Sequence, residues 1–119
     1  MGVGSVKSVY VETERRRYER VEEPVCTWLL FRTDSAAYGT LTVDVGMEGA
    51  RFETHRRVAV GEHTLINLQL ASSSIECKGR VCWACCGEDG LFSFGVRFLD
   101  LCEVERDWLG RHLNQCALA

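Results

Sequence analysis

After Pro24, apolar residues recur at every second position in short runs, and this alternation restricts the possible folds more than any other feature of the chain. Successive side chains of a β-strand point to opposite faces of a sheet, so a period of two is typical of strands with one buried face. The clearest run is 92–98, where phenylalanine or valine alternates with serine, glycine and arginine. The pattern predicts a small antiparallel barrel or sandwich.

Six runs of this kind are bounded by turn residues and predict six strands: 25–31, 40–45, 50–53, 64–70, 75–86 and 92–98. Gly46-Met47-Glu48-Gly49 separates the second run from the third, and Gly87-Glu88-Asp89-Gly90 separates the last two. Glycine-bounded loops of this length join antiparallel neighbours. We therefore expect one hairpin at each of these two loops.

From Asp100 the apolar period becomes helical, and Trp108, Leu109 and Leu113 fall on one face. Asp100 and Glu103 have the spacing of a capping box, which predicts a helix start at this point. Such a helix must bury Trp108 and Leu113 against the strands. The predicted fold class is all-β, a barrel of about six strands covered by one terminal helix.

Length and composition indicate a single globular domain, because 119 residues with 46% hydrophobic side chains can form one core. Fourteen lysines and arginines against 17 aspartates and glutamates give a net charge of −3, which disfavours nucleic acid as a partner. A barrel that binds single-stranded nucleic acid through stacked aromatics is the alternative that this balance argues against. No apolar run is long enough to insert into a membrane or to form a secretory signal, so we expect a cytoplasmic protein. Residues 1–13 are expected to form a flexible arm.

Seven cysteines raise the possibilities of disulfides and of a zinc site: Cys26, Cys77, Cys82, Cys85, Cys86, Cys102 and Cys116. An odd number without an export signal favours free thiols. Cys82 and Cys85 form a C-x-x-C pair, but residues three apart on a strand face opposite ways, so buried apolar thiols are preferred to a metal site. The histidines have no nucleophilic partner at an informative spacing, and we expect no enzymatic activity.

The densest charged segment is 12–23, with four arginines and five glutamates. One interpretation is a solvated helical turn, stabilised by pairs such as Glu12 with Arg16. The other follows from spacing, because Arg16-x-x-x-Arg20 precedes Asp44-Val45-Gly46-Met47-Glu48-Gly49 by about two dozen residues. Taken singly, Asp44 could simply end a strand, and the two glycines could serve the loop.

Together and in this order, the two segments resemble the paired motifs of the PilZ domain family, R-x-x-x-R and [D/N]-x-S-x-x-G. The resemblance covers roughly residues 14–113, within a domain expected over residues 14–115. It implies a six-stranded antiparallel β-barrel with a C-terminal α-helix, which binds the bacterial second messenger cyclic di-GMP and needs no cofactor. An arginine fork suits this ligand because it pairs bidentately with phosphate or with guanine O6 and N7, and it stacks on purines.

The resemblance also implies roles for individual residues. Arg16 and Arg20 would clamp phosphate and guanine, and Arg15 would add a stacking or phosphate contact. Asp44 would accept hydrogen bonds from the guanine N1–H and amino group. Gly49 would let the backbone approach the ligand. Gly46 replaces the family serine, and the lost hydroxyl would cost about 0.5 to 1.5 kcal/mol, or up to roughly tenfold in affinity.

The leading hypothesis is a cyclic di-GMP receptor that signals when ligand contacts at Arg16 and Arg20 pull the N-terminal arm onto the barrel, which alters a surface for a partner protein. The alternative keeps the fold without the ligand. It is an adaptor whose site has degenerated at Gly46, and which regulates motility, pili or exopolysaccharide through protein contacts alone.

Overall fold

The computed structural model describes residues 20–118, which form six strands and one helix. The elements are β1 (Cys26–Phe31), β2 (Tyr38–Val45), β3 (Gly49–Thr54), β4 (His63–Gln69), β5 (Ser74–Cys86), β6 (Phe92–Phe98) and α2 (Glu103–Leu118). All six predicted strands are confirmed, and their observed ends lie within about two residues of the predicted ones. The arm predicted for residues 1–13 lies outside the described residues.

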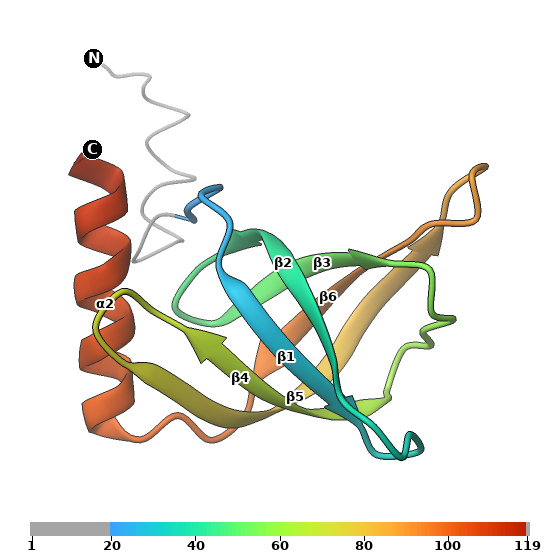
Figure 1. Ribbon diagram of the computed structural model, residues 1–119, viewed down its shortest axis with the longest axis horizontal. Coiled ribbons are helices and arrows are strands. Elements are labelled where there is room, and N and C mark those ends of the chain that lie inside the picture. The colour runs from blue at the N-terminus through green and yellow to red at the C-terminus, as the bar shows by residue number, and fades with distance from the viewer. Residues whose placement is uncertain (1–19, 119) are drawn as a thin grey trace.

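The strands form a closed antiparallel barrel in the order β1-β2-β3-β6-β5-β4 (Figure 1). The predicted fold class is therefore confirmed. Closure pairs the first strand of the order with the last, so the barrel has no free strand edge along its length. Within residues 20–118, no helix has the length and apolar character needed to cross a bilayer.

Large apolar side chains from all six strands fill the barrel interior. Phe31, Phe52 and Phe94 are fully buried, and the rings of Phe52 and Phe94 stack with centroids 5.6 Å apart. These residues occupy the inward positions of the alternating runs, as the period of two predicted. Burial of such apolar surface is the main stabilising contribution to a small domain.

Helix α2 stands along one end of the barrel (Figure 1). Leu109 and Leu113 are buried in the core cluster, which also includes Met47 from the loop between β2 and β3. The expectation that Trp108 is buried was wrong, because its side chain remains 38% exposed. The helix presents a narrower apolar stripe to the barrel than its sequence pattern predicted, and Trp108 lies at the margin of that stripe.

The helix begins two residues later than the predicted capping box implies. The backbone N–H of Cys102 donates to the carboxylate of Glu105 at 3.3 Å, so Cys102 and Glu105 take the capping positions. Asp100 has a different role, because its carboxylate accepts the backbone N–H of Lys78 at 2.7 Å. The first residues of β5 precede its pairing with β6, which starts at Gly79, and this carboxylate satisfies a donor that the ladder leaves free.

A β-bulge interrupts the simple alternation predicted for β2. The pairing of β2 with β3 shifts between Thr42 and Asp44, so Val43 is the additional residue. Before the bulge the polar Thr42 is buried, where its hydroxyl accepts the backbone N–H of Val25 at 2.9 Å, and Leu41 is exposed. After the bulge Val45 faces the core, which leaves Asp44 on the outer surface of the barrel.

The seven cysteines all lie within the described residues, and each is a free thiol. The expectation of buried thiols was wrong for Cys82, Cys85 and Cys86, which are exposed at the end of β5. Cys77 alone is buried, and burial raises the pKa of its thiol to about 12.

Candidate functional site

The segment before β1 is fixed to the end of β2 by a two-residue bridge. Val21 and Val45 exchange backbone hydrogen bonds of 2.8 and 2.9 Å, and both side chains are buried in the core. Because Arg20 and Asp44 each precede a bridged residue, both side chains point to the face opposite the buried valines, and the long Arg20 side chain reaches across the antiparallel bridge to Asp44. A sequence separation of 24 residues is thus closed by local backbone pairing.

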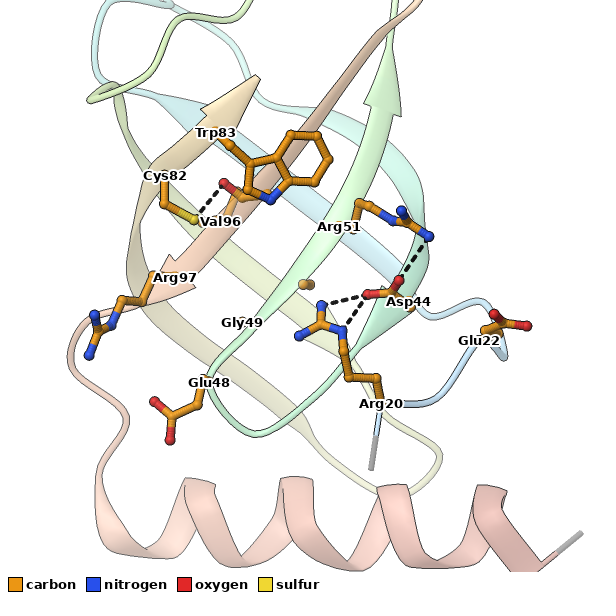
Figure 2. Close-up of a pocket in the computed structure, with 12 residues that line it drawn as sticks. Arg20, Glu22, Asp44, Glu48, Gly49, Arg51, Cys82, Trp83, Val96 and Arg97 are labelled. Carbon is orange, nitrogen blue, oxygen red and sulfur yellow. Dashed lines mark hydrogen bonds and ion pairs between the residues drawn. The ribbon is translucent and has the colours of Figure 1, made fainter. Parts of the chain in front are cut away.

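Asp44 is held between two arginines (Figure 2). Arg20 donates from Nε and Nη2 to Asp44 Oδ1 at 2.9 and 2.5 Å, and Arg51 Nη2 lies 3.0 Å from Oδ2. The Asp44 side chain is only 12% exposed, whereas Arg20 and Arg51 are 32% and 43% exposed. The carboxylate is therefore nearly covered, and both guanidinium groups remain accessible to a ligand.

The outer surface continues from this cluster as a row of paired residues across four strands. Asp44 on β2 is paired with Arg51 on β3, Arg51 with Gly95 on β6, and Gly95 with Trp83 on β5. A second bulge, at Cys82, turns Trp83 outward, because the additional residue reverses the side-chain alternation after the buried Val81. The row presents a carboxylate, a guanidinium and an indole along one face.

Gly95 makes room for the indole of Trp83. A Cβ atom on Gly95 would lie 2.1 Å from the indole nitrogen of Trp83, so any larger residue would displace the ring. The indole is partly exposed beside the groove, and an exposed ring face of this kind can stack on a planar ligand.

A groove of about 820 Å³ runs along this row. Arg20, Arg51 and Arg97 contribute positive charge to its lining, and Glu22 and Glu48 lie at its sides (Figure 2). Lining groups of both signs suit a ligand that carries phosphates together with hydrogen-bond donors, and do not favour a simple polyanion. The volume lies within the range typical of small-molecule sites.

The structure brings together most of the predicted site residues that it describes. Arg20, Asp44 and Gly49 line the groove, and Gly46 lies under Arg20, where a Cβ atom would be 3.3 Å from Arg20 Cγ. The fold itself requires glycine at position 49, because a Cβ atom there would lie 2.1 Å from the carbonyl oxygen of Val96 on β6. Arg15 and Arg16 lie outside the described residues.

The sequence analysis missed several groove residues, and among them are Arg51, Trp83 and Arg97, whose charge or ring could contact a ligand. The signal for Arg51 was available, because the glycine loop between β2 and β3 sets the register that places it beside Asp44. Trp83 could not be found in this way, because strict alternation along β5 would direct it into the core.

Comparison with known protein families assigns the fold. A model of the PilZ domain family matches residues 14–115 of the chain. The chain belongs to the PilZ domain family. The resemblance stated from the two arginines, Asp44 and the loop glycines is thereby confirmed, and PilZ domains are regulatory receptor domains.

Solved structures similar to this PilZ domain share its fold at low identity. The Bacillus subtilis inhibitor of motility (MotI/DgrA) is 14% identical with a TM-score of 0.75, and the match covers 87% of this chain and 52% of that one. The PilZ domain of Escherichia coli YcgR with c-di-GMP is 14% identical, with a TM-score of 0.67 and 87% and 92% of the chains covered.

The Borreliella burgdorferi PlzA protein in complex with c-di-GMP is 9% identical, with a TM-score of 0.57 and 92% and 56% of the chains covered. This PilZ domain therefore spans about half the length of MotI/DgrA and of PlzA. No match is found among curated proteins.

Proposed function

We propose that this PilZ domain is a receptor for cyclic di-GMP and that the groove beside Asp44 is its ligand site. The observation that carries the proposal is the Arg20–Asp44 pair, in which an arginine and a carboxylate from distant motifs meet at the groove. A guanine base offers acceptors to the arginine and two donors to the carboxylate. The two side chains together can thus recognise one guanine.

Ligand binding in this site requires an exchange of partners at Asp44. A carboxylate has about four lone-pair sites; Arg20 donates two hydrogen bonds to Oδ1, and Arg51 forms an ion pair with Oδ2. The guanine N1–H and amino group need two. Arg20 therefore leaves Asp44 for the O6 and N7 atoms of the base or for a phosphate, and the guanine edge takes its place on the carboxylate.

The remaining groove residues fit the other parts of the ligand. Arg51 and Arg97 project charge where phosphates would lie, and the exposed ring of Trp83 offers a stacking surface for a base. These contacts share the ligand charge among several guanidinium groups. Loss of any single one would weaken binding without preventing it.

The exchange at Asp44 also offers a route for signalling. Arg20 directly precedes the Val21–Val45 bridge, so its exchange of partners takes place at the junction between the barrel and the preceding residues. Those residues include Arg15 and Arg16, which the proposal assigns to the ligand. Binding would thus reposition the N-terminal segment and change the surface offered to a partner protein.

Isothermal titration of cyclic di-GMP into the purified chain tests the receptor. We expect a Kd well below about 100 μM for the wild type, and Arg20→Ala should weaken it by roughly tenfold to a hundredfold, since a hydrogen bond to a charged group contributes about 1.5 to 3 kcal/mol. Arg111→Ala is the matched control, because Arg111 is exposed on α2 and should leave the affinity unchanged. No binding at about 100 μM would refute the receptor.

Gly46 is the observation that favours the second candidate, a PilZ adaptor without ligand. The missing hydroxyl removes one ligand contact, and Arg20 lies over the position that a side chain would occupy. Gly46→Ser restores the family residue and needs only a small shift of Arg20. If the wild type fails to bind while Gly46→Ser binds, the adaptor is the correct function; if both bind, the receptor is.

A further inference from the structure

A second surface, on the outer face of β1, β4 and β5, carries an exposed apolar ridge. Trp28 and Leu65 are each 53% exposed. Leu30 is partly exposed, follows Trp28 by two residues on the same face of β1, and lies beside Leu65 on β4. Leu30 is paired with Leu65 on β4, and Leu65 with Lys78 on β5. We name the surface formed by Trp28, Leu30, Leu65 and Lys78, with the neighbouring Arg32, His63 and Arg80, the β1–β4–β5 face.

The face contains a continuous depression. One part, of about 360 Å³, lies beside Trp28, and the other, of about 330 Å³, lies beside Arg32 and His63. Leu30, Leu65 and Lys78 line both parts, so the two adjoin. From Trp28 to Arg32 the depression follows β1 for roughly 13 Å, which accommodates about four residues of an extended segment.

One end of the face carries a surplus of positive charge. Arg32, Lys78 and Arg80 are exposed, and among residues 20–118 no carboxylate forms an ion pair with them. At this end Asp34 and Glu62 both bind Arg56, and the other acidic lining groups, Glu76 and Asp100, belong to the part of the depression beside Trp28. This surplus stands out in a chain whose net charge is −3.

Among residues 20–118, the arrangement of the strands and the helix leaves this face open. In Figure 1, β1 and β4 cross the front of the barrel, whereas α2 stands at one end. The face shares no residue with the groove at Asp44. Because the barrel is closed, a partner cannot add a strand to an edge and must engage side chains on the face.

We propose that the β1–β4–β5 face is the docking site for a partner protein, which inserts a segment of apolar residues interspersed with aspartate or glutamate. The apolar side chains would cover Trp28, Leu30 and Leu65, and the carboxylates would pair with Arg32, Lys78 and Arg80. A second copy of this chain fits less well, since its acidic groups on this face already have partners: Asn67 donates to Glu76, the backbone N–H of Lys78 donates to Asp100, and Asp34 binds Arg56. The proposal does not depend on the receptor function, because the two surfaces are separate.

The test uses two synthetic probes of about eight residues, one alternating leucine with glutamate and the other alternating leucine with lysine. The three tryptophans report separately on the face, the ligand groove and the helix, since they are Trp28, Trp83 and Trp108. In proton–nitrogen NMR spectra of the full chain, the acidic probe should shift the indole signal of Trp28 and leave the other two in place. The basic probe should shift none of the three.

Variants of the face make the test quantitative. By fluorescence anisotropy the acidic probe should bind with a Kd on the order of 100 μM, and Lys78→Glu with Arg80→Glu, or Leu65→Ser, should each weaken binding tenfold or more. Arg57→Glu and Val60→Ser are the matched controls, because both residues are exposed in the segment between β3 and β4. They should leave the affinity unchanged.

Three results would overturn the proposal. The first is equal binding of the acidic and basic probes, and the second is unchanged affinity in the face variants. The third is a wild-type dimer in sedimentation that Leu65→Ser dissociates, which would assign the face to a second copy. A variant that unfolds does not affect the test, because the NMR arm uses the wild-type chain.

Discussion

Gly49→Ala separates the two roles that Gly49 can have, one in the barrel and one at the ligand. The added Cβ atom would lie 2.1 Å from the carbonyl oxygen of Val96 and 3.1 Å from its carbonyl carbon. The obstructing atoms belong to the backbone of β6, which pairs with β3 at this point, so no rotamer change can relieve the contact. The two strands must separate by roughly 1 Å, and overpacking of this severity lies at or above the top of the usual range of 1 to 3 kcal/mol.

We therefore expect Gly49→Ala to lower the free energy of unfolding by about 3 kcal/mol. For a domain of this size, that corresponds to a fall in Tm of about 12 °C. Thermal denaturation followed by circular dichroism measures the change. Gly46→Ala is the matched control from the same loop, because its Cβ atom would meet only the side chain of Arg20, at 3.3 Å, and its stability should stay within about 1 kcal/mol of the wild type.

A Tm for Gly49→Ala within about 2 °C of the wild type would refute this reasoning. If such a stable variant also lost cyclic di-GMP in titration, the glycine would be needed for the ligand and not for the barrel. A destabilised variant that still binds the ligand at low temperature would support the structural role.

Three further predictions concern the rest of the barrel. The hydrogen bonds from Arg56 hold the pKa values of Asp34 and Glu62 below their ordinary 3.8 and 4.5. Stability should therefore be constant above about pH 5 and fall as the pH drops through the lowered pKa values. In measurements of Tm against pH, Arg56→Gln should make this loss of stability at acidic pH smaller. In thiol titration at pH 8 the five exposed cysteines should react before Cys77, whose thiol should react only upon unfolding; early modification of Cys77 would contradict its burial. Leu109→Ala should cost about 2 to 5 kcal/mol in urea denaturation, because Leu109 is fully buried between α2 and the barrel, whereas a change below about 1 kcal/mol would mean that the helix does not cover the core.

The strands were predictable from sequence because the alternation of buried and exposed positions is a local property. The run 92–98 was located to the residue, and the other strands differ only at their ends. The start of α2 was not, because Asp100 accepts the backbone N–H of Lys78 and does not cap the helix; only the register of β5 and β6 leaves this donor unpaired and places it beside Asp100.

The residues of the candidate site also fall into those that the sequence predicted and those that only the structure revealed. Motif order along the chain identified Arg20 and Asp44 as partners, and their meeting depends on a short backbone bridge that the sequence does not display. Arg15 and Arg16 stay predictions. Alternation along 40–45 places Asp44 opposite the buried Val45, as observed. Two bulges, each one added residue, decide what alternation could not: one exposes Leu41 and buries Thr42, and the other turns Trp83 outward.

By itself, the sequence determined the fold class and the number of strands, because the alternation of apolar residues follows from local strand geometry. It also contained the two motifs of the family, which are visible in the order and spacing of the residues. Only the tertiary structure decided which side chains share a surface, because strand register and the position of each bulge depend on the packing of all six strands at once. The groove at Asp44 and the apolar β1–β4–β5 face are both products of that register.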